Sequence, residues 1–292
     1  MNHDIHSIDA ATLSHLQSWQ GRSEATHDEI TAAPLRGLSA TLDREDPPVL
    51  RGTEVPPLWH WLYFLPQHRQ SEISGDGHAA RGGFLPPVPL PRRMWAGGEL
   101  QWHAPLRVGD AVERRSTIES VSHKSGRSGD LVFVVVRHEF HGPQGLALTE
   151  RHNIVYRPAA RPGDVAPTPT AAARGAAWTR RLQPDDVLLF RYSALTFNGH
   201  RIHYDRRYVT EQEGYPGLVV HGPLIATLLL DLLRRHLPDA RVHTLSFKAV
   251  RPTFDLHPMQ VNGQPAPDGR SVELWAQDHE GWLTMQARVT LA

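Results

Sequence analysis

An internal duplication is the feature of this sequence that most limits its possible folds. Segments 100–110 and 245–255 share a leucine, an aromatic residue, an alanine and an aspartate, each pair 145 positions apart in a chain of 292 residues. A Pro/Ala-rich stretch, 158–177, separates two halves of similar length and has the composition of an extended connector. We therefore expect two diverged copies of one domain, at 1–157 and 178–292.

Each half continues, after its copy of the repeat, into strand-like runs. Val, Ile, Thr and aromatic residues bounded by Gly and Pro are typical of antiparallel strands joined by tight turns. The expected strands are 131–136 and 146–156 in the first half, and 271–276 and 282–291 in the second. Each half also holds one apolar helix, at 223–236 in the second and at the shorter, aromatic 57–65 in the first. A buried helix covered by antiparallel strands, twice over, is an α+β plan.

The composition excludes several classes of function. The chain has no cysteine, which excludes disulfides, thiolate zinc sites, iron–sulfur clusters and a cysteine nucleophile. Lys+Arg and Asp+Glu are both 31, a balance that argues against a nucleic-acid or membrane-surface partner. The most apolar run, 224–233, is too short to cross a bilayer, and no signal peptide is visible. We expect a cytoplasmic protein with a small-molecule partner, as a monomer or homodimer.

The densest group of polar and catalytically competent side chains lies early in the second half. Residues 191–205 read RYSALTFNGHRIHYD, and 214–224 read GYPGLVVHGPL at the start of the expected helix. The pair resembles the central motif of the MaoC-like, (R)-specific enoyl-CoA hydratases, Asp-x-Asn-Pro-Leu-His followed by a Gly/Pro turn and His-Gly. His203 matches the motif histidine, and His221-Gly222 matches the His-Gly pair.

The resemblance covers most of residues 50–291 and implies a double hot-dog fold. In that fold each copy has a long central helix wrapped by an antiparallel sheet. It also implies that the first copy is degenerate and that the C-terminal copy, 178–292, is catalytic. A Gly/Pro-rich insertion, 66–98, interrupts the first copy. Long ordered loops in compact domains are usually functional.

The sequence departs from the family motif at three positions. Asn198 replaces the aspartate, His200 the asparagine and Arg201 the proline. This variant, with the insertion, resembles a branch that includes fungal-type mitochondrial dehydratases and bacterial hydratases of C5 dicarboxyl-CoA esters. It implies hydration of mesaconyl-C4-CoA (3-methylfumaryl-CoA) or itaconyl-CoA to citramalyl-CoA, with no cofactor beyond the CoA of the substrate. The alternatives are a (3R)-hydroxyacyl-thioester dehydratase of fatty-acid metabolism and a non-catalytic acyl-CoA-binding module.

Hydration of an enoyl thioester needs a base for water and a donor for the enolate oxygen. The family match assigns His203 as the base and the backbone N–H of Gly222, at a helix N-terminus, as the oxyanion donor. Asn198 cannot transfer a proton, so we expect it to position water or the thioester; the alternative is a turn residue. His221 is expected to cap or orient the loop.

Basic residues supply candidate substrate contacts, since arginine pairs bidentately with carboxylates. For a free carboxylate the candidates are Arg81, Arg92, Arg93 and His78, and for CoA phosphates Arg201 and Lys248. Each is alternatively a surface or structural residue. His200 and His203 have a spacing that metal ligands use, but no carboxylate-bearing zinc motif accompanies them, so no metal is expected.

Overall fold

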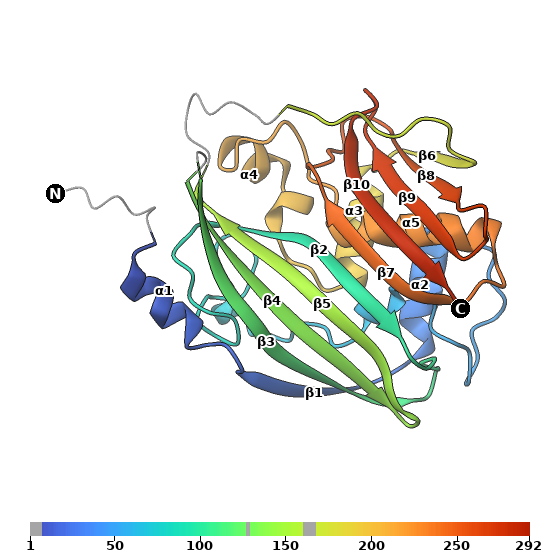
Figure 1. Ribbon diagram of the computed structural model, residues 1–292, viewed down its shortest axis with the longest axis horizontal. Coiled ribbons are helices and arrows are strands. Elements are labelled where there is room, and N and C mark those ends of the chain that lie inside the picture. Colours follow the sequence, from blue (N-terminus) through green and yellow to red (C-terminus); the bar gives the residue numbers. More distant parts are fainter. Residues whose placement is uncertain (1–7, 127–128, 160–167) are drawn as a thin grey trace.

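A single antiparallel sheet dominates the structure, a computed structural model that describes residues 8–126, 129–159 and 168–292 (Figure 1). Its strands lie in the order β1-β3-β4-β5-β2-β7-β10-β9-β8-β6. The first five along the chain are β1 (Ser23–Glu29), β2 (Arg92–Trp102), β3 (Ala111–Gly126), β4 (Gly129–Gly142) and β5 (Gly145–Arg157). The others are β6 (Trp178–Leu182), β7 (Val242–Ala249), β8 (Met259–Pro265), β9 (Ser271–Gln277) and β10 (Leu283–Leu291).

The order of the strands repeats the sequence duplication. The N-terminal half contributes β1-β3-β4-β5-β2 and the C-terminal half the same pattern reversed, β7-β10-β9-β8-β6, so the halves meet where β2 pairs with β7. Leu100 and Leu245, which begin the two copies of the repeat, are direct cross-strand partners. Two equivalent strands paired antiparallel at the middle of a sheet place an approximate two-fold axis there. The strands expected from the sequence, and the α+β double hot-dog class, are confirmed.

Helix α5 (Gly222–His236) is the central helix of the C-terminal half, and it confirms the expected helix at 223–236. Every residue from Leu224 to Leu233 is buried, because the helix packs against β6, β8, β9 and β10. The other helices are α1 (Ala10–Gln17), α2 (Ala32–Thr41), α3 (Asp186–Leu195) and α4 (Arg206–Glu211), with 3-10 turns η1 (Trp59–Leu62), η2 (Gln70–Glu72) and η3 (Arg201–His203). No helix in the described part of the chain is long and apolar enough to span a membrane.

The expected helix at 57–65 is wrong. Only the single turn η1 forms there, because Leu58 before it and Phe64 after it both adopt left-handed backbone conformations, with φ of 70° and 54°. A left-handed residue cannot continue a right-handed helix. A longer helix in the N-terminal half is α2, which packs beside η1 and α3.

The insertion is shorter than its composition indicated, because 92–98 already belong to β2. Gly97 explains part of this misreading. A Cβ there would lie 2.3 Å from the carbonyl oxygen of Phe247, so glycine is needed where β7 approaches closely. Residues 160–167 of the expected linker lie outside the described part of the chain. The described remainder of 158–177 has no helix, and Ala171 forms an isolated bridge with Trp282.

A buried ionic network fixes the C-terminal end of α5. Asp231 is 3% exposed and accepts hydrogen bonds from Arg44 (2.6 Å), Arg180 (2.7 Å) and Arg235 (2.7 Å). These guanidinium groups come from the segment after α2, from β6 and from α5 itself. The network therefore ties both halves of the chain to the central helix.

Candidate active site

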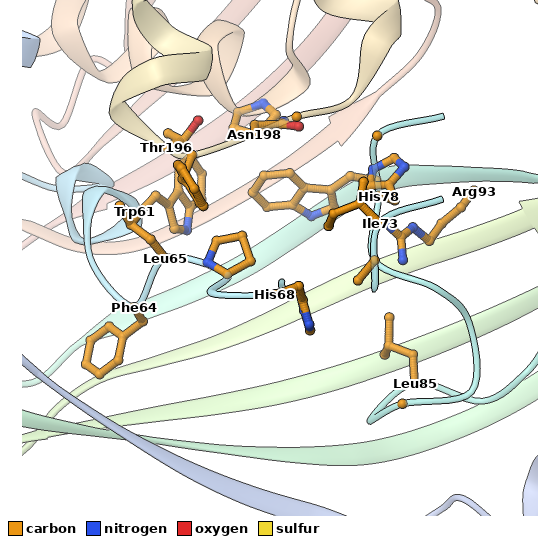
Figure 2. A pocket seen from close by; sticks show the side chains of 18 of the residues that line it. Trp61, Phe64, Leu65, His68, Ile73, His78, Leu85, Arg93, Thr196 and Asn198 are labelled. Carbon is orange, nitrogen blue, oxygen red and sulfur yellow. The ribbon is translucent and has the colours of Figure 1, made fainter. Parts of the chain in front are cut away.

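A cavity of about 1220 Å³ lies between the two halves of the molecule. Its described wall includes η1 and the segment after it, the insertion, strands β2 to β5, and α3 with the loop that follows it. Figure 2 shows the side chains that converge on it, with Asn198 and Thr196 on one wall and Leu85 on the opposite one. The apolar part of the lining includes Trp61, Phe64, Leu65, Ile73, Leu85 and Trp95.

Asn198 borders the cavity at the turn that ends α3. Phe197, with φ of 49°, reverses the chain, and the Asn198 N–H donates to the carbonyl oxygen of Ser193 (2.8 Å). The Asn198 side-chain oxygen accepts from the His200 N–H (3.0 Å), which is an Asx turn. The side chain thus has the turn role weighed above. Its amide nitrogen remains able to donate toward a ligand in the cavity.

His203 is the last residue of the 3-10 turn η3 and is 7% exposed. Its Nδ1 donates to the carbonyl oxygen of Val219 (2.7 Å), which fixes the tautomer and leaves Nε2 with the lone pair. Burial lowers the pKa of His203 to about 4, so the ring is neutral near pH 7. A neutral imidazole with one free lone pair is the form that a general base requires.

His221 is fully buried and stacks on His203, with ring centroids 3.7 Å apart. Its Nε2 is 2.8 Å from the hydroxyl of Ser193, while its Nδ1 is buried without a hydrogen-bond partner. Burial also holds the pKa of His221 well below its usual value. The ring therefore lies against His203, and it makes no side-chain capping bond to α5, so the capping role weighed from the sequence is not what it does.

Gly222 begins α5, and the preceding His221 makes no side-chain capping bond. Among the described residues no backbone carbonyl accepts from the Gly222 N–H, and a Cβ at this position would meet nothing within 4 Å. An unpaired N–H at the positive end of a helix, with open space beside it, can stabilise an oxyanion.

The structure brings the predicted catalytic residues together but gives them unequal access to the cavity. Its lining includes Ser193, Asn198, Arg201, Tyr204 and Pro223. His203 and Gly222 adjoin these residues without belonging to the lining among the described parts of the chain. Asn198 is thus the member of the predicted catalytic set that a ligand in the cavity meets first.

The insertion completes this part of the site from the other half of the molecule. The backbone N–H of Arg201 donates to the carbonyl oxygen of Asp76 (2.9 Å), and its guanidinium donates to that of Gly75 (2.9 Å). A Cβ at Gly77, where φ is 91°, would lie 1.8 Å from the carbonyl oxygen of Gly199. Only glycine allows the two loops to approach so closely.

The ring of His200 packs against the insertion. The group of possible metal ligands that contains His200 is completed by residues of the insertion and does not include His203. Its ring lies 3.9 Å from that of His78, whose Nδ1 is 3.1 Å from the Asp76 carboxylate. Ligand atoms of Asp76, His78 and His200 all lie within 4.8 Å of one another, a spacing that could hold a metal ion. Asp76 already accepts two hydrogen bonds from His78, which hold the pKa of this carboxyl below its usual range.

Two arginines of the insertion, Arg81 and Arg93, belong to the described lining of the cavity, and Arg92 does not. Arg81 donates to the carbonyl oxygens of Val88 and Leu90, both at 2.7 Å, and so holds the insertion together. Arg92 donates to the carbonyl oxygen of Glu213 (2.8 Å) and lies over Tyr215. Arg93 lines the cavity near His78 (Figure 2), and it differs from Arg81 in that no carbonyl oxygen of the insertion holds its guanidinium among the described residues.

The two residues expected at the CoA phosphates are placed differently. Arg201 borders the cavity, where it pairs with Asp205 (2.7 Å) and lies over Tyr208. Lys248 is exposed on β7, opposite Gly97 of β2. Arg201 is therefore near the candidate site, while Lys248 lies on the sheet.

Sequence reasoning missed a second polar group on the cavity wall, formed by Arg114, His138, Glu150 and His152. These four residues, which we call the inner-wall cluster, lie on β3, β4 and β5. Strand register puts His138 directly opposite Glu150. The signal was the alternation of polar residues along strands of a buried sheet, RHEFH at 137–141 and TERHN at 149–153. Only the register between strands shows that these residues meet.

With this geometry in hand, comparison with known proteins identifies the family. A model of the hydroxyacyl-thioester dehydratase type 2 family matches residues 58–255, a span that includes η1, the insertion and both motif segments. The chain belongs to the hydroxyacyl-thioester dehydratase type 2 family. It is therefore a hydro-lyase of the hydratase and dehydratase type, as expected from the motif.

Similar proteins support this assignment by sequence and the hot-dog fold by structure. This dehydratase-family chain is 45% identical over 277 residues to the mesaconyl-C(4)-CoA hydratase of Chloroflexus aurantiacus, covering 94% of this chain and 97% of that protein. That similarity supports acyl-CoA hydratase activity. A solved MaoC-like dehydratase matches with a TM-score of 0.70 at 15% identity, covering 94% of this chain and 99% of that one. A Mycobacterium tuberculosis protein described as a double hot-dog fold matches with a TM-score of 0.57 at 14% identity, covering 93% and 96%.

Proposed function

We propose that this acyl-CoA hydratase acts on a branched C5 dicarboxyl-CoA ester, mesaconyl-C4-CoA or itaconyl-CoA, and forms citramalyl-CoA. The proposal rests chiefly on Arg93, an arginine of the cavity wall for which no ion-pair partner lies among the described residues. A guanidinium group without a counter-ion in a partly desolvated cavity favours a ligand that carries a carboxylate.

The position of Arg93 fits the shape of such a substrate. In mesaconyl-C4-CoA the free carboxylate is attached to the carbon that receives water, so its partner must lie near the catalytic base. Arg93 lies near His78, whose ring is 3.9 Å from His200, and His200 is in turn 5.5 Å from His203. A short chain of contacts therefore connects the carboxylate partner with the base.

For mesaconyl-C4-CoA, whose double bond is conjugated with the thioester, the reaction follows from the roles of three groups. Itaconyl-CoA carries its double bond one position farther from the thioester and must first isomerise to mesaconyl-C4-CoA to follow the same route. His203 Nε2 removes a proton from water while the oxygen adds to the β-carbon of the enoyl ester. The electron pair of the double bond moves onto the thioester oxygen, where the N–H of Gly222 and the helix dipole stabilise the negative charge. The imidazolium returns its proton to the α-carbon as the enolate collapses, so that H and OH have been added and His203 is neutral again. Asn198 orients the water or the thioester through its amide group.

A (3R)-hydroxyacyl-thioester dehydratase of fatty-acid metabolism is the second candidate. The observation in its favour is the apolar portion of the wall, which includes Phe64, Leu65, Ile73 and Leu85 (Figure 2). A straight apolar acyl chain would fit there without an arginine. The two candidates therefore differ in the contribution of Arg93 to specificity.

Parallel assays of the purified protein with mesaconyl-C4-CoA, itaconyl-CoA and crotonyl-CoA test the proposal. We expect kcat/KM for a C5 diacid ester to exceed that for crotonyl-CoA at least tenfold. Arg93→Met should reduce this preference, whereas Arg92→Met, the neighbouring arginine held by Glu213, should retain it. Preference of the wild type for crotonyl-CoA would support the fatty-acyl dehydratase, and binding of the esters without turnover would support a non-catalytic acyl-CoA-binding module.

A further inference from the structure

The inner-wall cluster carries charge that a C5 substrate held by Arg93 does not use. Figure 2 places Arg93 and Phe64 at opposite sides of the cavity, with Asn198 and Trp61 between them. The guanidinium of Arg114 lies 5.1 Å from the ring centre of Phe64. Arg93 and Arg114 therefore lie at opposite sides of the cavity, whose lining also includes Arg81 and Arg201.

Glu150 is already saturated by partners from η1. Its carboxylate, 3% exposed, accepts hydrogen bonds from His60 Nε2 (3.1 Å) and from Trp61 Nε1 (3.1 Å). The hydrogen bond from His60 is the main influence that lowers the pKa of Glu150 to about 2, against the effect of its burial. Glu150 is therefore a fixed anion whose oxygens are occupied.

Arg114 is not neutralised in the same way. Among the described residues no carboxylate lies within ion-pair distance of its guanidinium, and its Nε is buried without a hydrogen-bond partner. A buried polar atom without a partner is unfavourable unless a ligand satisfies it. Glu24, Glu150 and Asp28 act on Arg114 only from beyond ion-pair distance, so its guanidinium remains able to pair with an anionic ligand.

Two neutral histidines complete the cluster. His138 is bonded through Nδ1 to the hydroxyl of Ser116 (2.8 Å), and His152 packs against Trp95 with ring centroids 4.3 Å apart. Burial lowers the pKa of His138 to about 3 and that of His152 to about 4. A neutral imidazole can donate a hydrogen bond to a bound anion. When no anion is bound, it leaves no unpaired charge in the cavity.

The size of the cavity indicates what such an anion would be attached to. At about 1220 Å³ it exceeds the range of roughly 300–1,000 Å³ that is typical of small-ligand pockets. Trp61 and Trp95, whose ring centroids are 4.9 Å apart, form an apolar wall that continues to the cluster through the Trp61–Glu150 hydrogen bond and the Trp95–His152 contact. An acyl chain lying along these rings would end at the inner-wall cluster.

We propose that the inner-wall cluster is a second carboxylate-binding site, which takes the distal carboxylate of a straight-chain dicarboxylyl-CoA ester longer than C5. The inference rests on the proposed function only in taking the cavity as the acyl site. Arg114 provides the counter-ion, and His138 and His152 donate hydrogen bonds to the same carboxylate.

Calorimetric titration with saturated CoA esters of matched length tests this site without requiring turnover. We expect adipyl-CoA and suberyl-CoA to bind wild-type protein at least tenfold more tightly than hexanoyl-CoA and octanoyl-CoA. Arg114→Met should abolish that difference. Arg115→Met is the matched control, because Arg115 is the next residue of β3, is exposed and pairs with Glu113 at 2.8 Å. Arg93→Met should leave the difference intact.

Equal binding of carboxyl-ended and methyl-ended esters by the wild type would overturn the inference, and this comparison needs no variant to fold. An unchanged preference in a folded Arg114→Met protein would do the same. Hydration of mesaconyl-C4-CoA, assayed on the same preparation, reports separately on the proposed function. Turnover of the C5 ester without a preference among the long esters would remove the second site alone.

Discussion

The imidazole rings of His203 and His221 are stacked nearly parallel, with centroids 3.7 Å apart and an angle of 18° between their planes. Both rings are buried, and protonation of either would place a cation against its neighbour. His221 is held by the Ser193 hydroxyl and His203 by the Val219 carbonyl, so each ring has one fixed nitrogen. The pair therefore presents His203 as a rigid, neutral base.

Replacement of His203 by alanine should lower kcat by about 10²–10⁴-fold, the usual contribution of a general base. Binding of CoA esters should change little, since His203 does not belong to the described lining of the cavity. Steady-state hydration kinetics and calorimetry with a saturated ester measure the two effects. His27→Ala, at an exposed position of β1, is the control. Activity within a few-fold of the wild type would exclude His203 from the mechanism.

Substitution of Asn198 separates orientation from proton transfer. Asn198→Asp keeps an oxygen that can accept from the His200 N–H, so the turn should persist and part of the activity should remain. Asn198→Ala removes both the turn bond and the amide donor, so we expect a larger loss of kcat. Kinetics of the two variants, with circular dichroism to verify folding, provide the comparison. Equal activities of Asn198→Ala and the wild type would assign Asn198 to the turn alone.

The sequence predicted those parts of the fold that depend on local sequence patterns. The repeat located the strands that pair at the centre of the sheet, and the apolar run at 224–233 located the buried helix. The failure at 57–65 has a specific cause, since Leu58 and Phe64 are non-glycine residues held in left-handed conformations by tertiary packing. Neither residue type favours that conformation, so the sequence contains no signal for it.

Of the candidate site, the sequence predicted only the part contributed by the C-terminal half. Asn198, His203 and Gly222 lie in two motif segments that are close together in the sequence. The choice among Arg81, Arg92 and Arg93 depends instead on which carbonyl oxygens each can reach. The contact between Gly77 and Gly199 joins loops more than a hundred residues apart, and the hydrogen bond between His60 and Glu150 joins residues 90 positions apart. Such pairings are set by tertiary packing, which no local pattern encodes.

Acid should destabilise the folded protein through its buried histidines. The pKa values of His138, His152 and His203 are lowered by burial to about 3, 4 and 4, below the value of roughly 6.5 in an unfolded chain. Between these limits the unfolded state binds more protons, so stability is retained above about pH 6.5 and lost as the pH falls toward 4. Thermal denaturation at pH 7 and pH 5 should show a Tm lower by several degrees at pH 5. The double variant His138→Asn and His152→Gln should show a smaller difference in Tm between pH 7 and pH 5. An unchanged difference would show that other groups cause the pH dependence.

Removal of the Asp231 carboxylate should destabilise the whole chain. Asp231→Ala leaves Arg44, Arg180 and Arg235 without their shared anion at the end of α5, and the loss of one partner from a buried ion pair costs about 3–5 kcal/mol. Asp239→Ala, in the exposed segment just after the helix, should change the free energy of unfolding by less than about 0.5 kcal/mol. Urea denaturation of both variants measures this difference.

Because α5 carries Gly222 at its other end, Asp231→Ala should also lower the temperature at which activity is lost, while kcat of the folded protein stays close to that of the wild type. A stability equal to that of Asp239→Ala would mean that the three arginines are neutralised by other groups.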